Sequence, residues 1–283
     1  MSSNRYVLTL SCPDRAGIVH AVTSVLVAAG CDITEHQQFD DAVHGLLFLR
    51  TSFSAPEGAR EQLDAAFFGV AEEYGMQWQL HDATRRTRVL VMASKFGHCL
   101  NDLLYRWKVG SLGVDIALVV SNHPDLGTMA GSAGVPFMHV PVTPETKDEA
   151  EARLLALIER HEIDLVVLAR YMQVLSDELC KALEGRAINI HHSFLPSFKG
   201  AKPYHQAYAR GVKQVGATAH YVTPHLDEGP IIEQEVIRVD HTYGPDDLVT
   251  VGRDAENLAL ARAVAWHGQH RVLLNDDRTV VFR

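Results

Sequence analysis

The chain has 283 residues, of which 47% are hydrophobic and 22% are charged, and its formal net charge is −9. This composition is ordinary for a globular enzyme and excludes a disordered or fibrous chain. The negative charge disfavours tight binding to a nucleic-acid backbone, which is held largely by lysine and arginine.

The N-terminal sequence has neither the basic start nor the long apolar core of a signal peptide, and no run of about 18 apolar residues could cross a bilayer. The four cysteines are far apart and form no CxxC pair, which is typical of buried thiols in a reducing compartment rather than of disulfides or a zinc site. These features predict a cytoplasmic protein that binds neither membranes nor nucleic acids.

The first 83 residues have the pattern of a small domain with the element order βαββαβ. The predicted strands are 6–11, 32–39, 46–53 and 76–80, and the predicted helices are 17–29 and 56–74. Gly30 and Gly75 follow the two helices, at the position where glycine commonly ends a helix. The order is that of a ferredoxin-like domain.

Residues 84–88 are polar and predict a linker, after which residues 89–283 change rhythm. Short apolar strands alternate with helices: the strands are 89–93, 114–120, 137–140 and 165–168, and the helices are 99–108, 145–160 and 176–184. Such alternation predicts an α/β domain with a mostly parallel sheet covered on both faces. Beyond Ala187 the strands become antiparallel in character, at 217–222 and 231–239, and a last helix spans 246–266.

Polar residues concentrate in two late stretches, 187–196 and 216–230. Asn189 and His191 are two residues apart, so an extended strand would place both on one face, at the sheet edge where α/β proteins bind ligands. Asp227 lies in a loop bounded by glycine and proline. An amide, an imidazole and a carboxylate together suit chemistry at a carbonyl, because they can hold an oxyanion, move a proton and orient a water. Taken singly, these residues fit structural roles at a strand end and in a turn better than catalytic ones.

A metal site at His191 and His192 is not predicted. Adjacent residues of a strand point to opposite faces, and no third ligand has metal spacing, although His220 and His225 are near in sequence.

The longer pattern resembles the signature of the formyltransferase family that uses 10-formyltetrahydrofolate. The matching pieces are Asn189-Ile-His191, Ser193-Phe-Leu-Pro196, Gly200, His220-Tyr-Val and Leu226-Asp-Glu-Gly-Pro230. The resemblance implies a Rossmann-like formyltransferase fold for residues 89–283 and a catalytic trio of Asn189, His191 and Asp227. It also implies that the folate is the substrate and that no cofactor or metal is required.

The resemblance further implies which residues hold the folate. They lie in one turn and one loop: Arg170, Tyr171, Met172, Gln173, Val174, Leu175, Thr223, Pro224, His225 and Leu226. Lys199 and Lys202 either face the acidic tail of the folate or are simply solvated, and the sequence leaves both interpretations open.

Two features are similar to the hydrolytic branch of this family, the formyltetrahydrofolate deformylases. His191 is followed by a second histidine where other members have His-Pro, and the turn after residue 93 holds Phe96 and His98 instead of a glycine-rich phosphate cradle. The resemblance implies that water takes the formyl group, which releases formate for purine synthesis and balances the folate pools. The alternatives are transfer of the formyl group to an amine and a non-catalytic folate or amino-acid sensor.

The N-terminal unit resembles an ACT domain, and Cys12-Pro-Asp-Arg-Ala-Gly17 matches the loop that enters its first helix. The resemblance implies an amino-acid effector site at Asp14, Arg15, Ala16 and Gly17 in a homo-oligomeric protein. A purely structural or oligomerisation role for this unit is the alternative.

Overall fold

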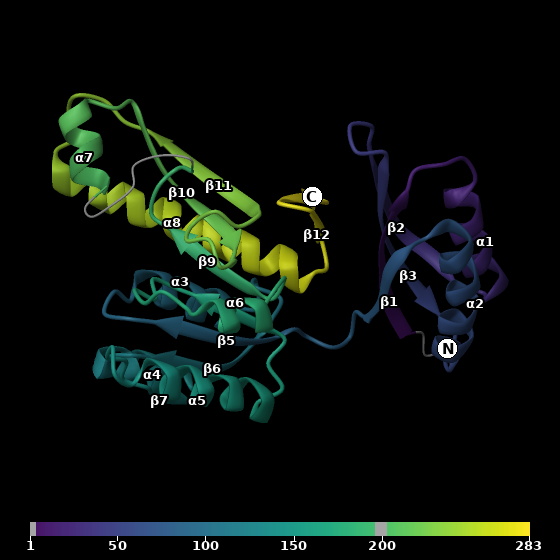
Figure 1. The fold of residues 1–283 in the computed structure, drawn as a ribbon, viewed down its shortest axis with the longest axis horizontal. Helices are drawn as coiled ribbons and strands as arrows, with labels where there is room; N and C mark the ends of the chain where they lie inside the picture. Colours follow the sequence, from purple (N-terminus) through teal and green to yellow (C-terminus); the bar gives the residue numbers. More distant parts are fainter. Residues whose placement is uncertain (1–3, 196–202) are drawn as a thin grey trace. The chain divides into compact units, whose positions relative to one another are not determined.

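The computed structural model describes residues 4–195 and 203–283, which are drawn in Figure 1. They form two compact units. The first contains residues 4–86 with Gln269–Asn275 and Val280–Arg283, and the second contains Thr87–Gly268 with Asp276–Thr279. None of the described helices combines the length and the apolar character that crossing a bilayer requires.

The first unit has the predicted βαββαβ order. Its elements are β1 (Asn4–Pro13), α1 (Ile18–Ala28), β2 (Asp32–Asp41), β3 (Leu46–Ala55), α2 (Ala59–Tyr74) and β4 (Gln77–Asp82). The strands form an antiparallel sheet in the order β2-β3-β1-β4. Helix α1 buries Ile18, Val22 and Leu26, which are spaced four apart and therefore share one face packed on the sheet. This ferredoxin-like, ACT-like arrangement confirms the predicted fold of the unit.

Two segments near the end of the chain, Gln269–Asn275 and Val280–Arg283, belong to this first unit, although residues 89–283 were predicted to form the second domain. They include β12 (Val272–Asn275), which pairs with β13 (Arg278–Val281). Arg50 of β3 is only 4% exposed and donates hydrogen bonds to the carbonyls of Gln269 and His270, each at 3.1 Å. These bonds satisfy a buried guanidinium, which is costly to leave unpaired.

The second unit is built on a seven-stranded sheet with the order β11-β10-β9-β8-β5-β6-β7. The strands are β5 (Arg88–Ala93), β6 (Asp115–Ser121), β7 (Phe137–His139), β8 (Leu165–Leu168), β9 (Ala187–His191), β10 (Gln214–Tyr221) and β11 (Ile231–Arg238). The pairs from β9 to β7 are parallel, and β10 runs antiparallel to both β9 and β11. The mostly parallel α/β sheet confirms the predicted fold class.

The chain changes direction across this sheet between β5 and β8. From β5 it moves through α3 (His98–Lys108) to β6 on one side, and later through α5 (Lys147–Arg160) and α6 (Asp177–Ala182) to β8 and β9 on the other. Because such crossovers are right-handed, α3 covers one face, and α5 and α6 cover the opposite face. The carboxyl ends of β5 and β8 therefore form the topological switch point, where open α/β sheets commonly bind ligands.

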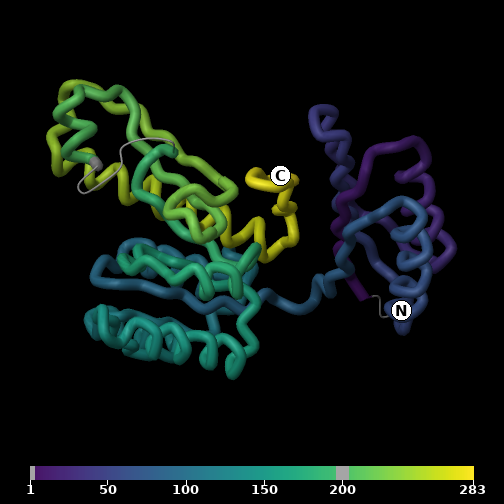
Figure 2. Tube along the Cα trace, viewed as in Figure 1, coloured from purple at the N-terminus to yellow at the C-terminus, as the bar shows by residue number. Residues whose placement is uncertain are grey.

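Helix α8 (Pro245–Gly268) packs on the antiparallel part of the sheet and on α3. In the trace of Figure 2 it runs, in yellow, beside the green strands β9 to β11. Helix α7 (Pro203–Arg210) packs on α8. Gly252 permits this close approach, because a Cβ added there would lie 2.1 Å from the Tyr204 ring.

The 3₁₀ turn η1 (Pro124–Leu126) and helix α4 (Gly127–Ala133) were not predicted from the sequence. Glycine lowers helix propensity, so a short stretch with Gly127, Gly131 and Gly134 gave no helical signal. The helix forms because it packs in place: a Cβ on Gly127 would lie 3.2 Å from the ring of Phe137 on β7.

Candidate active site

A cavity of about 1230 Å³ opens beyond the carboxyl end of β8, beside β9 and β10. It brings together every residue that the sequence predicted for catalysis and for folate binding. Its walls include Asn189, His191, Asp227, Arg170, Tyr171, Met172, Gln173, Val174, Leu175, Thr223, Pro224, His225 and Leu226. Asn189 and His191 come from β9, whereas Asp227 comes from the loop between β10 and β11.

The loop that carries Asp227 is fixed against the end of β10. Its Gly229 lies so close to the strand that an added Cβ would come within 1.8 Å of the Tyr221 carbonyl oxygen. The same strand end donates a hydrogen bond from the Tyr221 amide to the Pro230 carbonyl at 2.9 Å. Asp227 itself has a φ of 57°, a left-handed conformation that is uncommon outside glycine. The strained backbone and the close packing together hold the carboxylate at the cavity wall.

Asp227 accepts a hydrogen bond from His191, whose Nδ1 lies 3.1 Å from its Oδ2. Burial alone would raise the pKa of Asp227, but its contacts with His191 and His220 outweigh burial and hold that pKa well below its usual range. Asp227 is therefore a carboxylate throughout the neutral and mildly acidic range. Its bond to Nδ1 leaves Nε2 as the His191 nitrogen that can face a substrate.

His220 is a site residue to which the sequence analysis gave no role. It is 2% exposed, and its Nδ1 donates to the Tyr221 carbonyl at 2.8 Å. Its Nε2 can then accept from the Asn189 amide at 3.3 Å, and the same amide lies 3.4 Å from Asp227 Oδ1. Both amide hydrogens of Asn189 thus have acceptors within the site. His220 lies within the His-Tyr-Val motif of the family signature, but the motif alone does not reveal the structural role of this residue.

His192 lies between His191 and a buried ionic cluster. Its ring centroid is 5.1 Å from that of His191 and 6.4 Å from that of Tyr204. Burial and the nearby charge of Arg170 lower the pKa of His192 to about 4. The second histidine of the pair is therefore neutral at physiological pH.

This pKa predicts acid destabilisation of the second unit. The unfolded chain binds the His192 proton near pH 6.5, whereas the folded chain binds it near pH 4, so stability is complete above 6.5 and falls between these values. We expect a loss of roughly 3 kcal/mol over this range. Urea titrations read on the fluorescence of Trp107 and Trp266, in a Trp78→Phe background, would measure it.

In His192→Gln this part of the pH dependence should vanish, while His139→Gln, at an exposed histidine of β7, is the matched control. An unchanged pH dependence in His192→Gln would contradict the assignment.

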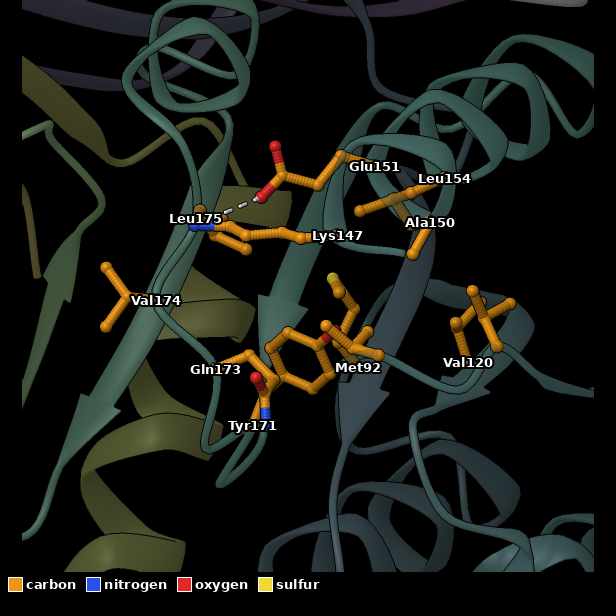
Figure 3. Close-up of a pocket in the computed structure, with 12 residues that line it drawn as sticks. Met92, Val120, Lys147, Ala150, Glu151, Leu154, Tyr171, Gln173, Val174 and Leu175 are labelled. Atoms are coloured by element: carbon orange, nitrogen blue, oxygen red, sulfur yellow. Dashed lines mark ion pairs between the residues drawn. The ribbon is translucent and has the colours of Figure 1, made fainter. Parts of the chain in front are cut away.

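The turn that is predicted to hold the folate, residues 170–175, is fixed by hydrogen bonds on both sides. Ser94, at the end of β5, accepts the Met172 amide at 3.0 Å, and Ser176 donates its amide to Glu151 of α5 at 2.9 Å. Figure 3 shows a second cavity beneath this turn, where Tyr171 lies beside Met92. With a volume of only about 20 Å³ it has room for about one water, so the turn is almost fully packed from below.

The rim of the large cavity exposes apolar side chains on both sides. Met172 and Val174 belong to the turn and are 55% and 58% exposed, and Leu226 of the opposite loop is 64% exposed. Apolar walls with a few directed polar groups are typical of sites that bind small organic molecules.

One group near the site has the ligand types of a metal centre. His98, Cys99 and Glu256 have donor atoms within 4.8 Å of one another. The carboxylate is already engaged, since His98 lies 2.8 Å from it, Tyr204 donates to it at 3.0 Å, and Arg170 lies 3.3 Å away. Burial also raises the pKa of the Cys99 thiol well above its ordinary value. A neutral thiol and a carboxylate already held by a guanidinium fit a cation poorly.

In the first unit, the predicted effector residues Asp14, Arg15, Ala16 and Gly17 form the exposed entry to α1. Arg15 donates to the carbonyl of Glu73 and lies over the Tyr74 ring at 4.1 Å. Gly17 has a φ of 99°, and an added Cβ there would lie 3.1 Å from the Tyr74 hydroxyl. Lys199 and Lys202, with the motif residues Pro196 and Gly200, lie outside the described residues.

Comparison with known proteins places this geometry in a family. The model of the formyl transferase family matches residues 87–264. The chain is 56% identical to the formyltetrahydrofolate deformylase of Corynebacterium sp. (strain P-1) over 282 residues, which is 99% of this chain and 98% of that one.

Solved structures show the same relationship. The crystal structure of formyltetrahydrofolate deformylase from Burkholderia mallei is 54% identical, has a TM-score of 0.95, and aligns over 99% of this chain and 100% of its own. Glycinamide ribonucleotide transformylase 1 from Symbiobacterium toebii is 29% identical with a TM-score of 0.65, and its alignment covers 70% of this chain and 95% of its own.

Proposed function

The chain belongs to the formyl transferase family and, within it, to the formyltetrahydrofolate deformylases, and we propose that Asn189, His191 and Asp227 carry out its reaction. The enzyme hydrolyses 10-formyltetrahydrofolate to formate and tetrahydrofolate. The observation that carries the proposed site is the convergence of these three side chains on one cavity that also contains the folate turn.

The reaction needs a water, a place for negative charge and a proton for the leaving nitrogen. The water oxygen attacks the formyl carbon and the carbonyl oxygen becomes an oxyanion. Collapse of this intermediate breaks the bond between carbon and N10, which takes up a proton and leaves as the amine. No step requires a nucleophilic side chain.

His191 and Asp227 act as a pair in this scheme. The 3.1 Å contact orients the imidazole, so that Nε2 faces the formyl group, stabilises the oxyanion and passes a proton to N10. The low pKa of Asp227 makes it a weak base by itself. Its carboxylate therefore orients the water as an acceptor, and Nε2 of His191 takes the proton that the water loses. The imidazolium formed in this way is stabilised by Asp227, donates to the oxyanion and then passes that proton to N10.

Asn189 supplies the second donor to the oxyanion. Because its two amide hydrogens face His220 and Asp227 in this structure, substrate binding must exchange one of these bonds for the formyl oxygen. His220 keeps the amide correctly oriented through its own bond to the Tyr221 carbonyl. His220 is thus a positioning residue for the trio.

The pterin lies between the turn Arg170–Leu175 and the loop Thr223–Leu226, held partly by backbone groups and partly by the apolar rim. The exposed faces of Met172, Val174 and Leu226 support this placement, because a bound ring would cover them.

Several wider properties belong to the same proposal. The folate is the substrate, the reaction uses no cofactor or metal, and the enzyme acts in the cytoplasm, where it supplies formate for purine synthesis and balances the folate pools. We also propose that the protein is a homo-oligomer and that an amino acid binds at the exposed segment Asp14–Gly17.

The direct test is formate release from 10-formyltetrahydrofolate by the purified protein with no acceptor added. Rapid formation of equal amounts of formate and tetrahydrofolate is expected. Folate binding without formate release would contradict the proposal, and a requirement for an added amine would indicate a transferase.

A further inference from the structure

Among the described residues, a cluster of polar side chains occupies the β5 side of the switch point, next to the large cavity. His98 enters this cluster from the segment that follows β5, and Arg170 enters from the end of β8. Both contact the carboxylate of Glu256, a residue of α8 that is 1% exposed. Tyr204 of α7 completes the group, which we call the ionic plug: His98, Arg170, Tyr204 and Glu256.

The plug is held by charge as well as by packing. Burial alone would raise the pKa of Glu256, but its bonds to His98 and Tyr204 and the charge of Arg170 outweigh burial and lower it. The carboxylate is therefore ionised and its oxygens are occupied. Arg170 is held in a left-handed conformation with a φ of 63°, and its guanidinium lies 5.9 Å from the ring of Phe96.

The plug directly adjoins the reacting end of the cavity. The row of rings that begins at His191 continues through His192 to Tyr204, and Arg170 lines the cavity itself. A second substrate that approached the formyl group from the switch point would have to occupy the volume of these side chains. The polar groups that follow β5 are also paired: Ser94 donates a hydrogen bond to Asn122 at 2.7 Å and accepts one from the Met172 amide.

The same fold elsewhere serves a larger acceptor, as the name of the glycinamide ribonucleotide transformylase shows. We propose that the ionic plug determines acceptor choice in this enzyme: it fills the subsite for a phosphorylated amine, so that water is the formyl acceptor. This inference rests on the proposed function and adds the reason why hydrolysis replaces transfer. The plug residues do not touch the formyl group and act by exclusion.

Removal of the negative charge at the centre of the plug tests the inference. In Glu256→Gln, Arg170 loses its counter-ion and becomes available to a phosphate, for which a guanidinium is a strong partner. The nitrogen of an added amine would then attack the formyl carbon, the bond to N10 would break, and N10 would take up the proton that the amine loses.

The experiment is run on the full-length enzyme with 10-formyltetrahydrofolate and, in parallel, ethanolamine or O-phosphoethanolamine. Formate and the N-formyl amine are both quantified, and the partition between them is the readout. We expect the fraction of formyl groups recovered on O-phosphoethanolamine to rise about tenfold or more over wild type, with a smaller rise for ethanolamine.

Two further variants make the outcome decisive. Glu235→Gln removes a carboxylate of β11 that pairs with Arg262 at 2.6 Å, away from the plug, and should partition like wild type. His98→Ala opens the plug from its partly exposed side and should also raise capture, even if Glu256→Gln does not fold.

Folded plug variants that hydrolyse the substrate without capturing either amine would overturn the inference. Loss of hydrolysis without capture would overturn it too, because the cluster would then position the catalytic residues instead of excluding an acceptor. Absence of formate release by the wild type would instead contradict the proposed function, so the two failures are distinguishable.

Discussion

Replacement of Asp227 by asparagine is expected to slow formate release from 10-formyltetrahydrofolate by about 10³-fold or more and to leave tetrahydrofolate affinity within a few-fold of wild type. Asparagine keeps the shape of the side chain but loses the charge that orients the water. Its amide nitrogen could also face Nδ1 of His191, and two donors would then meet where the wild type has a 3.1 Å contact. The expected defect therefore lies in the chemical step.

Single-turnover formate release and a fluorescence titration with tetrahydrofolate separate these two effects. Asp240→Asn is the matched control, since Asp240 is an exposed turn residue that accepts the Thr242 amide at 2.9 Å. Turnover close to wild type in Asp227→Asn would remove Asp227 from the mechanism.

Substitution of His191 is expected to have the second largest effect, and two different replacements distinguish its two roles. Alanine removes both the donor to the oxyanion and the proton carrier, and a loss of about 10²–10⁴-fold is expected. Glutamine can place an amide N–H near the position of Nε2 but cannot carry a proton. If oxyanion stabilisation dominates, His191→Gln should retain markedly more activity than His191→Ala.

The rates of both variants are measured across the pH range with purified, folded protein. Equal losses in the two variants would assign the main role to proton transfer. His205→Gln, at an exposed histidine of α7, controls for the loss of a histidine. A His191→Ala variant within a few-fold of wild type would contradict a catalytic role altogether.

Much of the fold was predictable because apolar runs and glycine positions carry local information. The runs that became β5 and β8 are almost wholly apolar, as strands buried on both faces must be. The terminal hairpin of β12 and β13 was missed because four-residue strands give almost no periodic signal. Whether its strands belong to the first or the second unit depends on long-range contacts, such as those of Arg50, which no local pattern contains.

The site was predictable to the extent that its residues share a motif. Asn189 and His191 share a strand face by simple alternation, and the Asp227 loop is marked by glycine and proline. Glu256 was missed because it is one of four acidic residues in a long helix, with Asp246, Asp247 and Asp254. A signal did exist, since Glu256 lies between the buried Ala255 and Ala259, on the face of α8 that also buries Gly252. An acid on an apolar stripe marks a buried ionic contact, but only the structure identifies the partners.

The C-terminal segment has a consequence for how the protein is made. The first unit is discontinuous in sequence, and Arg50 donates hydrogen bonds to the carbonyls of Gln269 and His270 in its C-terminal part. When residues 4–86 have been synthesised, Arg50 has Glu35 as an acceptor but still lacks the two carbonyl acceptors of the C-terminal segment. The N-terminal unit therefore reaches its final bonding only after synthesis of the whole catalytic unit, and a fragment that stops at Arg86 is expected to be less stable than the same residues in the complete chain.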